Sequence, residues 1–321
     1  MNPLGNPADV AHLHLLINHV PTVGLVLGIG LFLLALVRGN RDLQWTSLEV
    51  FYLIAVGSLP AYISGVAAQG VLRQRGGAPE MAMAAHQAAA LLALVWIELT
   101  GVAAWFGLWQ ARRHGAPAQR TLAAVFVLAV VAMATMAWAA NLGGYIRHPE
   151  INPAAAAAAA AAPWVDVAAM GEFILSHMWM WPTGETLHFL GMSLSFGVLL
   201  VVNLYLLGIS RSVQYSAVHR LLPWGMLGLM LNVATGMMFF TGVPQQYLEN
   251  PTFHWKVIFL VLVGVNYLYL TVFDRPWRAA ASLDRRPTLA DKALAFSTLS
   301  TWIVVMYLGR MLPYLRVVFE H

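Results

Sequence analysis

The sequence predicts an all-α integral membrane protein whose eight transmembrane helices form two four-helix bundles. The composition carries the first part of this prediction, because 60% of the 321 residues are hydrophobic and only 10% are charged. Soluble domains carry about 25% charged residues. The mean hydropathy of +0.68 agrees with a membrane protein. Apolar segments of about 20 residues, the length needed to cross a bilayer, also recur along the whole chain.

The sequence contains eight segments of this length. They are expected at residues 13–37, 48–72, 83–110, 120–143, 184–209, 221–243, 254–274 and 292–314. The region between the fourth and fifth segments holds an alanine run at 154–162 and the sequence MWMWP, whose Trp179 and Trp181 suit a membrane interface. The expected organisation is therefore a first bundle at residues 1–148, a linker at 149–183 and a second bundle at 184–321.

Lysine and arginine predict the orientation of the chain. With eight spans, both termini lie on one face of the membrane, and 12 of the 18 basic residues fall on the opposite face, against 6 on the terminal face. Those 12 are Arg38, Arg41, Arg112, Arg113, Arg120, Arg211, Arg220, Arg275, Arg278, Arg285, Arg286 and Lys292. Because cytoplasmic loops are enriched in basic residues, we expect a multi-pass protein of the bacterial inner membrane with periplasmic N- and C-termini.

The composition excludes several classes of site. The chain has no cysteine, which rules out thiolate-bound zinc, iron–sulfur clusters, c-type haem attachment and disulfides. The net charge of +4 comes without a basic stripe interleaved with aromatic residues, so we expect no nucleic-acid partner. No phosphate-binding loop, dinucleotide motif or hydrolase triad is present. Any bound metal or haem must therefore be ligated by histidine or methionine, and the methionines scatter through apolar spans as core residues do.

The histidines gather on the periplasmic side, where 9 of the 11 are expected. His19 and His86 lie near the starts of the first and third spans, and His188 and His254 near the starts of the fifth and seventh. In an up-down bundle the first and third helices face each other diagonally across the core. Two imidazoles placed in this way can hold a b-type haem iron from opposite sides. The sequence therefore predicts two b haems, one per bundle, with these four histidines as iron ligands.

Other polar residues on the same side are candidates for supporting roles. His14 and His148 are suited to ligate a haem, to line a quinol pocket or to pass protons. Arg147, Lys256 and Arg310 can neutralise haem propionates, or can be interfacial cations that extend toward water. Helix-end histidines in contact with water are expected at His12, His114, His219 and His321.

Glycines near the histidines permit two interpretations. A flat porphyrin requires close approach of the backbone, but small residues also serve ordinary helix packing in membranes. The glycines concerned are Gly24, Gly28, Gly30, Gly143, Gly144, Gly191 and Gly197. Glu98, in the middle of the third span, is either a proton-relay carboxylate or a protonated packing residue.

Sequence motifs in the two halves resemble two uncharacterised bacterial membrane families. The first half, with HLHLLINHVPTVG, LPAYISGVAAQG and NLGGYIRHPEI, resembles a four-helix family that carries histidines on its first and third helices and at the end of its fourth. Ser64–Gly65 stands where that family usually has Thr-Gly. The second half, with GETLHFLGMSLSFGVLLVVNLYLLG, HRLLPWGMLGLMLNVATG and NPTFHWK, resembles a family described as cytochrome-like. These resemblances imply a fused, cytochrome b-like electron carrier.

We therefore expect a di-haem protein that passes electrons near the periplasmic face between the quinone pool and a periplasmic or membrane redox partner. An enzymatic role, as the quinol-linked oxidoreductase subunit of a larger respiratory complex, stays open. One alternative is a haem-free structural or assembly subunit of a respiratory or photosynthetic complex. Another is a transporter with proton-relaying histidines, which lacks the paired carboxylates and inverted repeat of such proteins.

Overall fold

The computed structural model describes residues 7–75, 80–147, 165–209, 215–273 and 288–314, and their regular structure is entirely α-helical. Eight helices in these ranges are long and apolar enough to cross a membrane, which confirms the predicted fold class. They cover His12–Arg38, Arg41–Gln74, Glu80–His114, Gln119–Ile146, Met180–Leu206, Ser216–Gly242, Pro251–Val272 and Leu289–Met311. The contacts divide the chain into two compact units, residues 1–169 and 170–321, and each is considered by itself.

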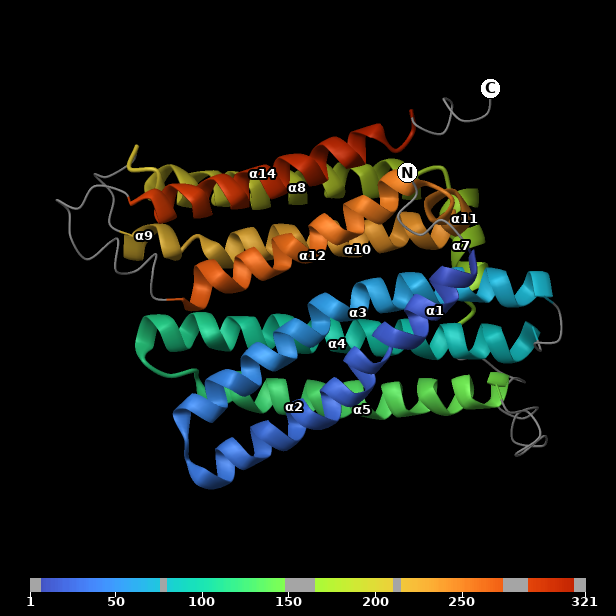
Figure 1. Ribbon diagram of the computed structural model, residues 1–321, viewed down its shortest axis with the longest axis horizontal. Helices are drawn as coiled ribbons and strands as arrows, with labels where there is room; N and C mark the ends of the chain where they lie inside the picture. The colour runs from blue at the N-terminus through green and yellow to red at the C-terminus, as the bar shows by residue number, and fades with distance from the viewer. Residues whose placement is uncertain (1–6, 76–79, 148–164, 210–214, 274–287, 315–321) are drawn as a thin grey trace. The chain divides into compact units, whose positions relative to one another are not determined.

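The first unit contains five helices that make up four spans (Figure 1). They are α1 (Pro7–Ile17), α2 (His19–Arg38), α3 (Arg41–Arg75), α4 (Glu80–His114) and α5 (Gln119–Arg147). The first span consists of two helices because the α-helical pattern is interrupted at Asn18. Helix α2 packs against α3 and α5, and α4 packs against the same two helices, so α2 and α4 occupy opposite corners. Helix α1 packs mainly on α3.

Small residues bring the helices of the first unit close together. A methyl group on Gly101 of α4 would overlap the Cβ atom of Ala55 on α3, so the two backbones touch. Around this contact the largest fully buried side chains include Trp105, Phe32 and Phe51. Close packing through small residues is the usual way in which membrane helices associate, because lipid supplies no hydrophobic force between them.

The described residues of the second unit form six helices and most of a seventh, and they include four candidate membrane spans (Figure 1). They are α7 (Val167–Ser176), α8 (Met180–Leu206), α9 (Tyr215–His219), α10 (Leu222–Gly242), α11 (Pro244–Leu248), α12 (Pro251–Val272) and α14 (Leu289–Met311). Helix α8 packs against α10 and α14, and α14 packs against α12. Ser195 Oγ on α8 lies 2.7 Å from the Tyr267 hydroxyl on α12, which adds a buried polar link.

The expected linker at 149–183 contains regular structure. Its alanine run lies outside the described residues, but 167–176 form helix α7 and α8 already begins at Met180. Trp181 thus belongs to a spanning helix, where its Nε1–H donates to Glu185 Oε1 over 3.1 Å. The arrangement of the spans as two four-helix bundles stays a prediction.

Candidate histidine sites

His14 points from α1 into the first unit and meets α3. Its Nδ1 atom lies 3.0 Å from the carbonyl oxygen of Ala61 and 3.3 Å from Ser64 Oγ. A methyl group on Gly65 would lie 2.9 Å from the imidazole Cε1 atom, so the ring occupies the space that this glycine leaves. Because a carbonyl oxygen can only accept, Nδ1 carries the proton and donates it to Ala61. The Nε2 atom of the neutral ring then carries a lone pair.

His86 of α4 is held in the same way by α5. Its Nδ1–H donates to the carbonyl oxygen of Ala139 on α5 over 2.8 Å. A methyl group on Gly143 would lie 3.2 Å from the ring, so α5 also leaves room for this imidazole. Among the described residues no hydrogen bond to the Nε2 atom of either His14 or His86 is found.

His14 and His86, called here the first-unit histidine pair, lie within electrostatic range of each other. Their helices α1 and α4 both pack on α3. Histidines that bind metals almost always donate the second ring N–H to a carbonyl, carboxylate or water, which fixes the tautomer and the direction of the ring. The pair therefore offers two oriented, neutral imidazoles whose Nε2 atoms can act as ligands.

The other predicted ligand candidates of the first unit are placed differently. His19 begins α2 and is exposed, and its Nδ1–H donates to the carbonyl oxygen of Leu15, 2.9 Å away in the preceding turn. The contacts of the structure bring His14, rather than His19, toward His86. Arg147 ends α5 with its side chain outside the described residues, and His148 lies outside them altogether.

In the second unit, His188 of α8 is supported by α10. Its Nδ1 atom lies 2.8 Å from Thr235 Oγ1. The Thr235 hydroxyl donates to the carbonyl oxygen of Leu231 over 2.6 Å, so its oxygen must accept from His188 Nδ1–H. As in the first unit, the lone pair of the neutral ring is on Nε2. Thr235 also precedes Gly236, whose added methyl group would lie 4.0 Å from the imidazole.

Lys256 of α12 lies within electrostatic range of His188. A methyl group on Gly309 of α14 would lie 3.3 Å from Lys256 Nζ, so the ammonium group reaches the surface of that helix. The part of the chain that the structure describes contains no salt bridge to Lys256. His188, Thr235, Lys256 and Gly309, on four different helices, form the His188–Lys256 site.

His254 lies on α12, the same helix as Lys256, and its pairing with His188 stays a prediction. It precedes Lys256 by two residues, which turns its side chain by about 200° around α12 from the direction of Lys256. The imidazole lies beside the backbone of Leu248, and its buried Nδ1 atom has no hydrogen bond of normal geometry within the described residues. Arg310 is exposed, with its guanidinium carbon 5.4 Å from the centre of the Tyr314 ring.

Tyr247 lies on the short helix α11, outside the candidate spans. Burial, and to a smaller extent the nearby Glu185 carboxylate, raise the pKa of Tyr247 to about 12. The phenol therefore stays protonated at any physiological pH and remains a hydrogen-bond donor.

One histidine contradicts the expectation of a helix end in water. His219 is fully buried, with Nε2 3.3 Å from the carbonyl oxygen of Thr271. The short helix α9 packs on α8 and carries this ring inward, which a local reading of the polar sequence around it does not reveal. His12 and His114 are exposed as predicted, and His321 lies outside the described residues.

Three of the seven glycines singled out in the sequence serve helix packing. Methyl groups on Gly24 and Gly28 would lie 3.0 Å from Ile54 and 2.9 Å from Phe51, and one on Gly191 would lie 2.8 Å from the Gly228 carbonyl oxygen. No described atom lies within 4 Å of a methyl group added to Gly30, Gly144 or Gly197. Sequence reasoning named Gly65 and Gly236 only within family motifs and did not connect them to His14 and His188. Each follows a hydroxyl residue that contacts a histidine, a signal present in the sequence as Ser-Gly and Thr-Gly.

Glu98 lies on α4, partly buried, and has no hydrogen bond or ion pair to another described residue. No group of three or more His, Asp or Glu side chains suited to a metal ion occurs within the described ranges. A haem iron needs only two axial protein ligands. The first-unit histidine pair has this number of side chains, each in the tautomer that a ligand requires.

Comparison with known proteins gives no match to a protein family, a curated protein or a solved structure.

Proposed function

We propose that this protein is a cytochrome b-like electron carrier of the bacterial inner membrane, with a b haem between His14 and His86. The observation that carries the proposal is the shared support of the two rings, since each Nδ1–H is committed to a backbone carbonyl and each Nε2 is left as a potential ligand. Such hydrogen bonds orient a ligand and raise its basicity.

Two kinds of residue in the first unit would position the haem ligands. Ala61 and Ala139 hold the imidazoles through their carbonyl oxygens, while Gly65 and Gly143 leave the space that the rings occupy. A bound b haem would supply one-electron redox chemistry, and the surrounding apolar helices would set its polarity and access to water.

The second haem expected from the sequence has weaker support. His188 has the right tautomer for a ligand, but the partner group found within electrostatic range of it is the ammonium group of Lys256. We therefore propose one haem, in the first unit, and a different role for the His188–Lys256 site.

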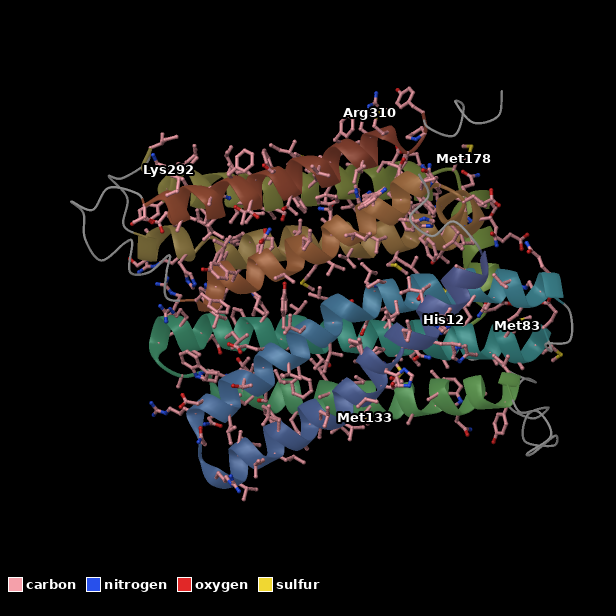
Figure 2. All side chains as sticks on the ribbon, in the orientation of Figure 1. His12, Met83, Met133, Met178, Lys292 and Arg310 are labelled. Atoms are coloured by element: carbon pink, nitrogen blue, oxygen red, sulfur yellow. The ribbon has the colours of Figure 1, made fainter. Side chains whose placement is uncertain are left out.

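The proposed haem lies toward the periplasmic side, and quinol and a periplasmic or membrane redox protein are the proposed electron donor and acceptor. The distribution of basic residues supports this orientation. Because α14 carries Lys292 and Arg310 near opposite ends (Figure 2), the support comes from the whole count of 12 basic residues on one face against 6 on the other. Cysteines introduced at Asn40 and Arg75 test it, because only the cysteine at position 75 should react with an impermeant thiol reagent added to the periplasm.

The test of haem binding is a pyridine haemochrome assay on the purified full-length protein, which should contain close to one b haem per chain. A folded protein without Soret absorbance would instead favour the haem-free structural subunit. A c-type spectrum is excluded in advance, since the chain has no cysteine.

A further inference from the structure

We infer that the His188–Lys256 site binds the head group of a membrane quinone or quinol. This rests on the proposed function only for the role of the quinone as redox partner. Binding itself requires no haem, because all the residues concerned belong to the second unit.

Lys256 supplies the first half of the argument. An ammonium group within a membrane span is costly and is usually paired or functional. The described residues provide Lys256 with no carboxylate, although its Nζ atom reaches across to α14 beside Gly309. A ligand that brings a hydrogen-bond acceptor would satisfy this group.

The second part of the argument is the acceptor atom of His188, which indicates the chemical class of the ligand. Because Thr235 takes the Nδ1–H, the neutral ring presents an acceptor at Nε2. The site thus combines one donor, Lys256 Nζ, with one acceptor, His188 Nε2. A carboxylate or phosphate would prefer two donors. A quinol matches the pair, since one hydroxyl can donate to Nε2 while the oxygen on the other side of the ring accepts from Nζ. The oxidised quinone keeps the contact to Nζ.

The neighbouring side chains suit a flat ring that arrives from the lipid. Phe239 lies edge-on to the His188 imidazole, with ring centres 5.8 Å apart, and Trp181 packs on Phe239 at 4.8 Å. Aromatic rings stack favourably on one another. Gly236 and Gly309 place no side chain against His188 and Lys256.

The experiment uses full-length protein in lipid nanodiscs with decylubiquinone carrying ¹³C at a ring carbonyl. Infrared difference spectra should show the labelled carbonyl band shifted to lower wavenumber by the contact to Lys256. Lys256→Met should remove this shift and weaken binding about tenfold, the usual effect of losing a hydrogen bond to a charged group. The matched control is Lys292→Met, because Lys292 is the other lysine of the chain and is exposed.

Three further measurements keep the outcomes distinct. Lys256→Arg should retain the shift, which guards against a loss caused by misfolding of the methionine variant. The His86→Ala variant should bind the quinone like the wild type, so that failure of the haem proposal leaves this one standing. An unshifted carbonyl in the wild type, or an equal shift in Lys256→Met, would overturn the inference. The inference would also be overturned if the protein did not bind the quinone but bound oleate, and if that binding were lost in Lys256→Met.

Discussion

Each unit holds one histidine beside a hydroxyl residue that is followed by a glycine. The group that lies near this histidine differs between the two units. In the first unit His14 contacts Ser64 and the space of Gly65, and in the second His188 contacts Thr235 and lies next to Gly236. Both rings are held with Nδ1 protonated. The first ring approaches another imidazole and the second approaches an ammonium group. Two imidazoles suit an iron ion, whereas an imidazole and an ammonium group suit an organic ligand with both a donor and an acceptor.

The largest expected difference between the two units is the effect of removing one histidine from each on the haem absorbance. His86→Ala should abolish the b-type absorbance, because an axial ligand is lost and nothing in the described second unit replaces it. His188→Ala should leave that absorbance unchanged. Optical spectra of both variants, with circular dichroism to confirm folding, measure this difference. If His188→Ala removes about half of the haem, the second unit holds a haem after all.

Glycine substitutions on α3 test the space for His14. Gly65→Ala places a methyl group 2.9 Å from the imidazole, so the ring must move. Disturbing the support of a metal ligand typically costs 10–100-fold in affinity, and we expect a loss of about tenfold in haem affinity. Gly70→Ala is the matched control on the same helix, since no atom lies within 4 Å of its added methyl group. Equal haem titrations for the two variants would place the haem away from His14.

Thr235→Val sharpens the comparison in the second unit. The valine removes the acceptor for His188 Nδ1–H, which frees the ring to rotate or change tautomer. Quinone affinity should fall about fivefold, the effect of one ordinary hydrogen bond, while haem content stays at the wild-type value. Thr186→Val, at an exposed position of α8, should affect neither. A fall in haem content with unchanged quinone binding would reverse the roles assigned to the two units.

Arg310→Ala should have the smallest effect. Its guanidinium group is exposed above the Tyr314 ring, so its loss removes a surface contact only. Haem content and reduction potential should both remain at wild-type values in a redox titration. A lowered potential would show that Arg310 neutralises a haem propionate, as the sequence alone allowed.

The sequence predicts the membrane spans well because a span is defined mainly by its length and its apolar composition. A bilayer demands about 20 apolar residues per helix, and this property is visible without knowledge of the neighbours. Candidate spans appear in the structure for all eight predicted segments, with bounds that differ by at most seven residues, at the start of the second span. The position of each histidine along its span follows from the same segments, whereas its depth in the membrane stays a prediction.

The direction of each side chain could not be predicted in this way. The sequence predicts a single first span that contains both His14 and His19, but in the structure α1 ends at Ile17 and α2 begins at His19. The pairing of His188 with Lys256 depends on how α12 is rotated against α8 and α14. Such rotations are set by contacts between residues that are distant in the sequence, for example Ser195 with Tyr267. The hydrophobic periodicity of a single helix carries no information about these contacts.

The most direct test of the central claim compares His14 with His19 in reduced-minus-oxidised spectra of the purified full-length protein. The account predicts a b-type spectrum for the wild type and for His19→Ala, and its loss in His14→Ala. The opposite pattern, with the spectrum lost in His19→Ala and kept in His14→Ala, would contradict the assignment of the haem to the first-unit histidine pair.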